Sequence, residues 1–243
     1  VLEFELLAFG LITGFTSGFF GIGGGSILIP MLLVAGFAMK EAVAISIMQM
    51  VFSSIYGSFL NSKKIKGLFR DGIILGVGAS IGGLFSGYFL PSIPDIYLQY
   101  LFIAVLIYTI YTLFKAPASQ EIIQEDKNIF LLAFIGFCVG IFAMSIGIGG
   151  SLMLLPILVQ FLKYDLKVAT ALGLFFVIFS SIGGFISTSL YGNMLYYEGA
   201  IIGIGSLIGV YFGIKIKEKT KSTSYKKFVL LLNLFVLATM IYK

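Results

Sequence analysis

A glycine-rich stretch inside an apolar segment is the strongest candidate for chemistry in this sequence. Residues 21–30 read Gly-Ile-Gly-Gly-Gly-Ser-Ile-Leu-Ile-Pro. A helix that begins at such a break points free backbone N–H groups and the positive end of its dipole at the break, and both favour an anion. Because glycine has no Cβ, a ligand can approach the backbone closely. The stretch therefore predicts a small-anion site at the start of a half-helix.

The same motif occurs again at residues 147–156, which read Gly-Ile-Gly-Gly-Ser-Leu-Met-Leu-Leu-Pro. Pro156 follows Pro30 by 126 positions, and further glycines recur at this spacing or at one residue more. The chain is thus a duplicated unit. We expect the two breaks to converge on one anion near the membrane midplane, in a site without a buried lysine or arginine. The alternative is that these glycines only let helices pack closely.

The predicted substrate-binding residues come from the two breaks and from the apolar segments that follow them. Gln49 lies within such a segment, and because its repeat equivalent is Phe176, its amide must find a partner inside the bundle. The serines of these segments either bond back to their own helix or line a path. The full set is Gly23, Gly24, Gly25, Ser26, Gln49, Ser53, Gly149, Gly150, Ser151 and Ser180.

Asp71 and Glu198 are matched carboxylates of the repeat, each at the start of a long apolar segment. A carboxylate there complements the helix dipole. The other interpretation is a role in coupling, such as proton binding.

Composition restricts the class of protein. The chain has 243 residues, 59% of them hydrophobic and 11% charged, and a mean hydropathy of +1.07. These values predict an all-α polytopic membrane protein. Without histidine, and with Cys138 as the single cysteine, the sequence offers no histidine-based catalysis or common zinc site, so no cofactor or metal is expected. The net charge of +5 gives no indication of nucleic-acid binding.

Segment lengths predict about 8–10 membrane segments of two kinds. Segments near 20 residues can span a bilayer. At a rise of about 1.5 Å per residue, segments 25–37 and 150–162 reach only about 20 Å, short of a hydrocarbon core of about 30 Å. We predict that these two are half-helices or re-entrant segments.

The positive charges predict the topology. Loops 61–71 and 215–227 are rich in lysine or arginine and are expected to be cytoplasmic, whereas their repeat equivalents, 188–198 and 91–97, have none. The prediction is two inverted five-segment repeats, 1–115 and 129–243, joined by a polar cytoplasmic linker, 116–128. Both termini are then expected on the outer side of the cytoplasmic membrane, opposite the cytoplasm.

The two motifs also identify a family. Gly-Phe-Phe-Gly-Ile-Gly-Gly-Gly-Ser-Ile-Leu-Ile-Pro (18–30) and Ser-Ile-Gly-Ile-Gly-Gly-Ser-Leu-Met-Leu-Leu-Pro (145–156), in a duplicated membrane protein of this size, resemble the TauE/SafE sulfite exporter family. The resemblance implies an inner-membrane protein that moves small sulfur-containing anions such as sulfite, thiosulfate or sulfoacetate. The copies differ, because Ser151 stands at the position of Gly25 and Leu152 at that of Ser26, which argues against a fully symmetric site.

We therefore predict a secondary transporter of small sulfur oxyanions or organosulfonates, and not an enzyme. Two alternatives stay open, a channel-like anion pathway and a membrane subunit that only anchors or senses. The expected partners are the substrate and the lipid bilayer, with no nucleic acid. The sequence leaves open whether the protein forms a homo-oligomer, in which direction it transports and which ion is coupled.

Overall fold

The fold is all-helical in the part of the chain that the structure describes. The computed structural model describes residues 2–21, 23–65, 69–115, 128–192, 194–220 and 222–242. The helices are α1 (Leu2–Phe20), α2 (Gly25–Val34), α3 (Met39–Ile65), α4 (Phe69–Phe89), α5 (Asp95–Lys115), α6 (Ile129–Ser145), α7 (Ser151–Pro156), α8 (Leu166–Tyr191), α9 (Tyr196–Lys219) and α10 (Ser222–Tyr242). A 3₁₀ turn, Leu90–Ser92, follows α4, and a π-helical turn, Ile157–Phe161, follows α7. The predicted fold class is confirmed.

Five helices are long and apolar enough to cross a membrane, and they include most of α3, α4, α5, α8 and α9. The outer surface of the bundle is apolar, with large exposed side chains such as Phe4, Phe59, Phe114 and Phe130. In water such a surface would be unfavourable, whereas in a bilayer it contacts acyl chains. The chain is a multi-pass membrane protein.

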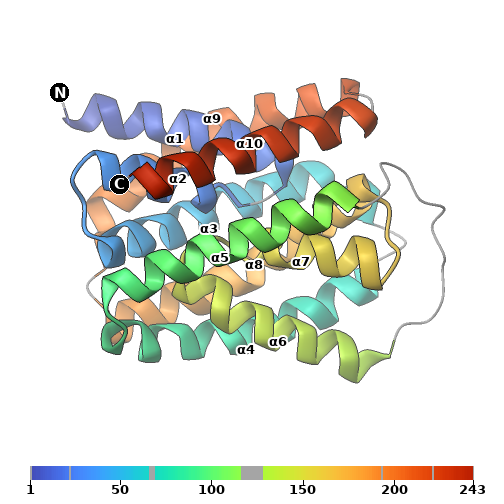
Figure 1. Ribbon diagram of the computed structural model, residues 1–243, viewed down its shortest axis with the longest axis horizontal. Helices are drawn as coiled ribbons and strands as arrows, with labels where there is room; N and C mark the ends of the chain where they lie inside the picture. The colour runs from blue at the N-terminus through green and yellow to red at the C-terminus, as the bar shows by residue number, and fades with distance from the viewer. Residues whose placement is uncertain are drawn as a thin grey trace.

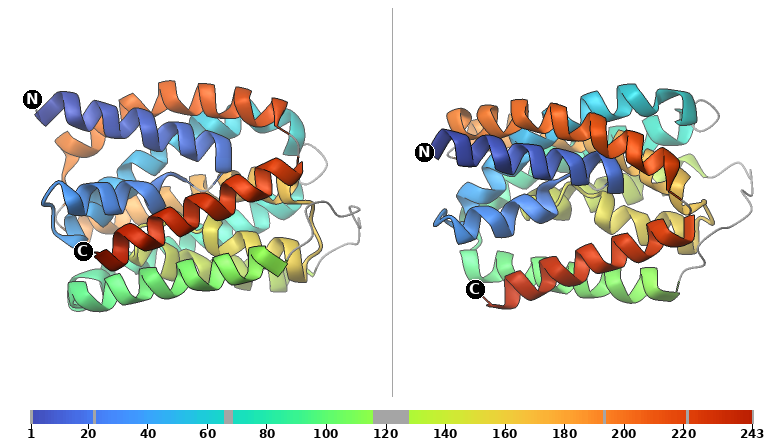
Figure 2. Two further views of the ribbon diagram at one scale, coloured as in Figure 1. Left: turned by 45° about the horizontal axis from the view of Figure 1, so that its top comes forward. Right: turned by 90° about the horizontal axis from the view of Figure 1, so that it is seen from above.

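The helices lie along one common direction (Figures 1 and 2). Both termini lie at one end of the bundle, and α5 ends and α6 begins at the other end (Figure 1). We call these the terminal end and the linker end. The most extensive contacts join α1 to α9 and α4 to α6, and α3 and α8 contact each other between these pairs. The predicted linker lies outside the described residues except for Asn128, which caps α6.

Equivalent glycines of the two halves make equivalent contacts, each with the opposite half. A Cβ built on Gly10 of α1 would lie 2.3 Å from the Ile202 carbonyl oxygen of α9, and one on Gly136 of α6 would lie 2.2 Å from the Leu75 carbonyl oxygen of α4. Ile202 is the repeat equivalent of Leu75. In Figure 1, α1 runs from left to right and α6 from right to left. The inverted orientation of the halves across a membrane stays a prediction.

The two short apolar segments form half-helices that begin at the glycines, as their lengths suggested. The residues before α2 and α7, Gly24 and Gly150, have φ angles of 78° and 73°, a left-handed conformation that glycine adopts without strain. The 10 residues of α2 extend only about 15 Å, too short to span a bilayer. Helix α7 changes to a π-helical turn directly after Pro156, which has no N–H to continue the α-helical pattern.

The expectation of a loop over 215–227 is wrong. Helix α9 continues to Lys219, and α10 begins at Ser222. Lysine and glutamate are good helix formers, so the charged residues Lys215, Lys217 and Glu218 extend the apolar helix instead of ending it. The described residues of the other predicted cytoplasmic loop, 61–71, are helical as well, because α3 continues to Ile65 and α4 begins at Phe69, and residues 66–68 lie outside the described residues.

Candidate functional site

The two glycine breaks are in direct contact at the centre of the bundle. A Cβ built on Gly25, at the start of α2, would lie 2.1 Å from the Gly147 carbonyl oxygen of the second break. The Ser46 hydroxyl of α3 donates a hydrogen bond to that same oxygen, at 2.9 Å. The two breaks, which were predicted to converge, thus contact each other through their backbones.

Gln49 gives the first break a polar lining. Both amide atoms of Gln49 would lie 3.0 Å from a Cβ on Gly24, the residue before α2. The side chain is fully buried, and neither its nitrogen nor its oxygen has a hydrogen-bond partner among the described residues. A buried polar atom left in this way costs about 1–3 kcal/mol. The site therefore has an unsatisfied donor and acceptor beside the start of a helix.

At the second break an aromatic ring replaces the amide. Phe176 is the repeat equivalent of Gln49, and a Cβ on Gly150 would lie 2.4 Å from its Cε1 atom. The ring is fully buried and packs against the backbone there. The two breaks therefore share a backbone conformation but differ in chemistry.

The predicted serines fall into two groups. Ser26 of α2 and Ser151 of α7 are buried, and neither hydroxyl has a partner among the described residues. Ser53 and Ser180 are also buried, but their hydroxyls donate to Met50 and Val177 of their own helices, at 3.4 and 3.3 Å. The first pair keeps hydroxyls available to a ligand, and the second pair bonds back to its helix.

The remaining predicted glycines have left-handed backbone conformations. Gly23 has a φ of 80°, and its Cβ would lie 3.2 Å from Met50 Sδ and 3.3 Å from Val177. Gly149 has a φ of 89° and is buried. Met50 is thus part of the lining of the first break.

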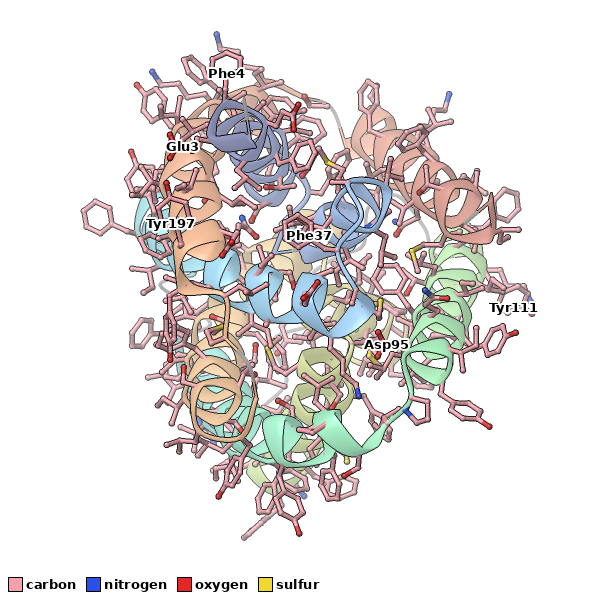
Figure 3. All side chains as sticks on the ribbon, turned by 90° about the vertical axis from the view of Figure 1, so that its left-hand side faces the viewer. Glu3, Phe4, Phe37, Asp95, Tyr111 and Tyr197 are labelled. Carbon is pink, nitrogen blue, oxygen red and sulfur yellow. The ribbon has the colours of Figure 1, made fainter. Side chains whose placement is uncertain are left out.

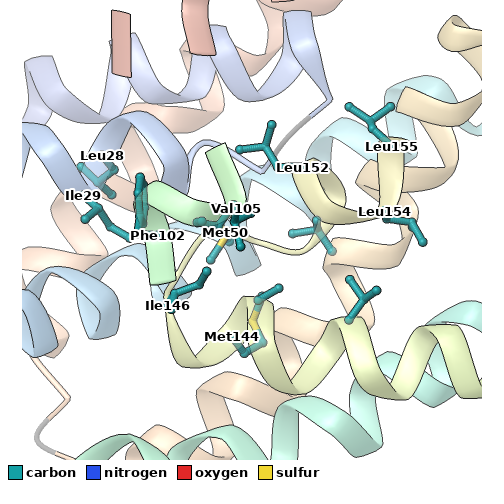
Figure 4. Close-up of a cluster of buried hydrophobic side chains, with 14 of the residues drawn as sticks. Leu28, Ile29, Met50, Phe102, Val105, Met144, Ile146, Leu152, Leu154 and Leu155 are labelled. Carbon is teal, nitrogen blue, oxygen red and sulfur yellow. The ribbon is translucent and has the colours of Figure 1, made fainter. Parts of the chain in front are cut away.

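Apolar packing holds the two half-helices in place. Figure 4 shows buried side chains of α2 (Leu28 and Ile29) and of α7 (Leu152) with Met50 and Phe102 between them. All five side chains are almost completely buried. The breaks are therefore set in a closely packed apolar surrounding of low dielectric constant, where hydrogen bonds to a charged ligand are strong.

Lys217 and Thr170 were not predicted as site residues. Lys217 of α9 is only 2% exposed, and its Nζ donates a hydrogen bond to Thr170 Oγ1 at 2.8 Å. The Thr170 carbonyl oxygen would lie 2.5 Å from a Cβ on Gly21, at the first break. The expectation of an anion site without a buried lysine stays a prediction, and Lys217 is a buried lysine in the last turn of α9. The missed signal is the spacing Gly205, Gly209, Gly213, Lys217, which puts the lysine on a packing face of α9.

The two matched carboxylates lie in the first turns of α4 and α9. Asp71 accepts a hydrogen bond from the Tyr164 hydroxyl, in the connection between the π-helical turn and α8. Burial, and then this bond to the carboxylate, raise the pKa of Tyr164 well above its usual value. Glu198 is partly buried. The carboxylates are thus part of helix starts.

Comparison with known proteins identifies the family. A family model described as Sulfite exporter TauE/SafE matches residues 6–240. The chain belongs to this family. Because TauE/SafE proteins are membrane transporters, the protein is a membrane transporter and not an enzyme.

Several relatives of this TauE/SafE protein cover nearly all of the chain. A probable membrane transporter protein of Methanocaldococcus jannaschii is 29% identical, over 90% of both chains. Another, from Haemophilus influenzae, is 25% identical over 98% of this chain and 95% of its own. YdhB of Bacillus subtilis, also described as a probable membrane transporter protein, is 24% identical over 84% of this chain and 86% of its own. No solved structure matches the chain.

In this TauE/SafE protein a cavity of about 300 Å³ lies among the ends of α3, α4, α8 and α9. Its lining includes Lys40, Glu41, Leu90 and Thr188, and the buried Thr188 hydroxyl has no partner among the described residues. Figure 3 looks onto this terminal end and shows Asp95, whose carboxylate lies 3.8 Å from Lys40 Nζ. The figure also labels Glu3 and Tyr197, whose hydrogen bond joins α1 to α9.

Proposed function

We propose that this protein is a secondary transporter of small sulfur-containing anions, such as sulfite, thiosulfate or an organosulfonate like sulfoacetate. The family model carries the description sulfite exporter, which supports this class of substrate. The anion binds at the first glycine break, between α2 and Gln49, and crosses by movement of one group of helices against the other. The expected location is the cytoplasmic membrane, with the linker end facing the cytoplasm.

The buried amide of Gln49 carries this proposal. An amide nitrogen next to the N-terminus of α2 adds a donor to backbone N–H groups that have no partner within the helix. The nearby hydroxyl of Ser26, in the first turn of the same half-helix, adds another. A sulfur oxyanion has oxygens on several sides and accepts hydrogen bonds from all three kinds of group.

The chemical difference between the two breaks supports an anion site that lies mainly at the first break. Phe176 fills the second break beside Gly150, so that break contributes the Gly147 carbonyl and the Ser151 hydroxyl to the surroundings of the first. Ser151 is close to the first break, because a Cβ on Gly173 would lie 2.9 Å from Ser151 Cβ and 3.5 Å from the Gly21 carbonyl oxygen. Residues of both halves thus take part, in unequal roles.

The test is flux in proteoliposomes for sulfite, thiosulfate, sulfoacetate, sulfate and chloride, comparing the wild type with Gln49→Met. Methionine keeps the length of the side chain and removes both polar atoms. A hydrogen bond to a charged group contributes about 1.5–3 kcal/mol, so the KM of the transported anion should rise about tenfold to a hundredfold. Gly25→Leu is a poorer test, because even a Cβ at Gly25 would collide with the Gly147 carbonyl.

Gln99→Met on α5 is the matched control, because Gln99 is half-buried at the start of that helix. Its KM should equal that of the wild type. Saturable flux of one sulfur anion, weakened by Gln49→Met alone, would support the proposal. Flux that rises linearly with concentration would favour a channel-like pathway, and wild-type protein that moves no sulfur anion would exclude the proposed substrates.

We also propose Asp71 and Glu198 as candidates for proton coupling. Each carboxylate lies in the first turn of a long helix, and Asp71 already shares a hydrogen-bonded proton with Tyr164. Asp71→Asn and Glu198→Gln should flatten the dependence of flux on pH if either group carries the proton. An unchanged pH profile in both variants would leave the carboxylates as helix caps.

A further inference from the structure

Ser17 is a buried polar residue near the end of α1. It is completely buried, and its hydroxyl has no partner among the described residues. A serine or threonine inside a helix can donate its hydroxyl proton to a carbonyl oxygen three or four residues earlier. The Thr13 and Thr16 hydroxyls of α1 do so, at 2.7 and 2.9 Å. Because a buried hydroxyl without a partner is unfavourable, the Ser17 hydroxyl calls for an explanation outside its own helix.

The path of α1 puts Ser17 at the first break. Its carbonyl oxygen accepts a hydrogen bond from the Gly21 N–H, at 2.8 Å, so Ser17 lies one turn before the first glycine of the break. One turn earlier on α1, the Thr13 carbonyl oxygen would lie 3.0 Å from a Cβ on Gly24, the same distance as the two amide atoms of Gln49. Since residues four apart share a helix face, Ser17 follows Thr13 along the face of α1 that contacts the break.

The second half shows where a side chain at this position points. Counting by the 126-residue spacing of the motifs, the equivalent of Ser17 is Ala143, and the equivalent of Gly24 is Gly150. A Cβ on Gly150 would lie 3.3 Å from the Ala143 Cβ and 2.4 Å from Phe176 Cε1. The Ala143 side chain is thus directed at the second break, and we infer the same direction for Ser17 at the first.

The two breaks therefore differ at two flanking positions. Serine and glutamine flank the first break, whereas alanine and phenylalanine flank the second. Ala143 is fully buried, so a small apolar residue satisfies the packing at this position. The first break has three polar atoms in addition, the Ser17 hydroxyl oxygen and the two amide atoms of Gln49. All three lack a partner among the described residues, and a ligand common to both residues would satisfy them.

We propose that Ser17 is a further anion-binding residue, whose hydroxyl donates a hydrogen bond to the transported anion at the first break. This inference rests on the proposed function and adds a third helix to the site. Ser17 belongs to α1, Gln49 to α3 and the free backbone N–H groups to α2, so three helices of the first half supply donors. An anion with three oxygens on one sulfur atom, such as sulfite or a sulfonate, offers an acceptor to each helix.

The test compares wild type, Ser17→Ala and Ser86→Ala in proteoliposomes and in detergent. Alanine reproduces the residue of the second half at position 17. Ser86 provides the matched control, because this buried serine of α4 donates to the Gly83 carbonyl oxygen of its own helix, at 2.7 Å. The readouts are the KM and Vmax of the anion that the wild type transports, equilibrium binding of that anion with a radioactive label, and the unfolding temperature without the anion.

Ser17→Ala should bind the anion about tenfold more weakly and raise its KM by a similar factor, because a hydrogen bond to a charged ligand is lost. Ser86→Ala should keep the wild-type KM and binding. Wild-type KM and binding in Ser17→Ala would overturn the inference, while saturable wild-type flux that Gln49→Met weakens would leave the proposed function intact. Wild-type protein that moves no sulfur anion would overturn both.

The unfolding temperature separates anion binding from a structural role of the hydroxyl. Without the anion, Ser17→Ala should unfold at the wild-type temperature or slightly above it, whereas Ser86→Ala should unfold at a lower temperature. A lower unfolding temperature for Ser17→Ala would show that the Ser17 hydroxyl is paired within the protein and would overturn the inference. Failure of Ser17→Ala to fold would overturn it as well, because the hydroxyl would then serve the fold.

Discussion

Ser26 and Ser46 carry the same hydroxyl group in opposite surroundings. The Ser46 hydroxyl lies 2.9 Å from the Val43 carbonyl oxygen of its own helix and 2.9 Å from the Gly147 carbonyl oxygen of the second break, so its proton has an acceptor in either position, whereas the buried Ser26 hydroxyl has no partner among the described residues. A hydrogen bond contributes about 1 kcal/mol to stability, and a buried hydroxyl without a partner contributes nothing or destabilises. Substitutions at the two serines should therefore have different effects, a loss of stability at Ser46 and a loss of ligand binding at Ser26.

We expect Ser46→Ala to lower the free energy of unfolding by about 1 kcal/mol. Ser26→Ala should leave it unchanged or raise it slightly, while it weakens anion transport. Thermal unfolding in detergent and flux in proteoliposomes measure the two effects on the same preparations. Ser26→Ala with a clear loss of stability would show that its hydroxyl is paired within the protein.

At the scale of residues, the sequence predicted the site only where a residue stood out from its apolar surroundings. Gln49 was singled out because an amide in the middle of a membrane segment needs a partner, but the structure gives its amide no partner among the described residues. The burial of Lys217 was not predicted because a lysine among other lysines resembles a loop, and only the three-dimensional packing of α9 shows that it turns inward. The separation of Ser26 and Ser151 from Ser53 and Ser180 also depends on side-chain rotamers, which the sequence does not specify.

At the scale of elements, close backbone contact at glycines joins α1 to α9 and α6 to α4. The added Cβ of an alanine at Gly10 or Gly136 would press on a carbonyl oxygen of the partner helix, at 2.3 and 2.2 Å. A helix backbone cannot turn aside as a side chain can. These two contacts therefore set the distance between the helices of each pair.

Gly10→Ala and Gly136→Ala should each lower stability by about 1–3 kcal/mol, and by similar amounts. Gly57→Ala is the control, because the nearest atom to its Cβ would be Leu174 Cδ2 at 2.6 Å, the end of a flexible side chain. Its loss of stability should be clearly smaller. Thermal unfolding in one detergent gives all three values, and sensitivity in only one of the helix pairs would contradict the equivalence of the halves.

The helical elements themselves were predictable because length and glycine position limit them strongly. A segment of 10 to 13 apolar residues after a run of glycines cannot span a bilayer, and the half-helices α2 and α7 follow from that. The end of α9 was not predictable from charge alone, since lysines stabilise a helix C-terminus as readily as they mark a loop.

At the scale of the whole molecule, residues exposed at the two ends of the bundle allow the predicted membrane topology to be tested. The connection after α2 lies at the terminal end, and the connection after the π-helical turn lies at the linker end (Figure 1). Ala35 and Lys163 are exposed in these two connections. Ala35 suits labelling better than Gly36, whose φ of 99° disfavours any side chain.

Ala35→Cys and Lys163→Cys, each combined with Cys138→Ser, should react with a membrane-impermeant maleimide from opposite sides. In intact cells Ala35→Cys should be labelled, and Lys163→Cys only after the membrane is opened. Labelling of both from the same side would rule out the inverted arrangement of the two halves, and labelling with the sides exchanged would reverse the predicted orientation.

The cavity at the terminal end has a consequence for the shape of the transport cycle. If the two halves exchange conformations, a matching cavity opens at the linker end, with Lys217 in the place that Leu90 now occupies. An anion that arrives from the terminal end meets Lys40 in this cavity, and one that arrives from the linker end then meets Lys217. Under the proposed carrier function both faces thus present a cation to an arriving anion, so the anion gradient, and not the protein, sets the direction of net movement.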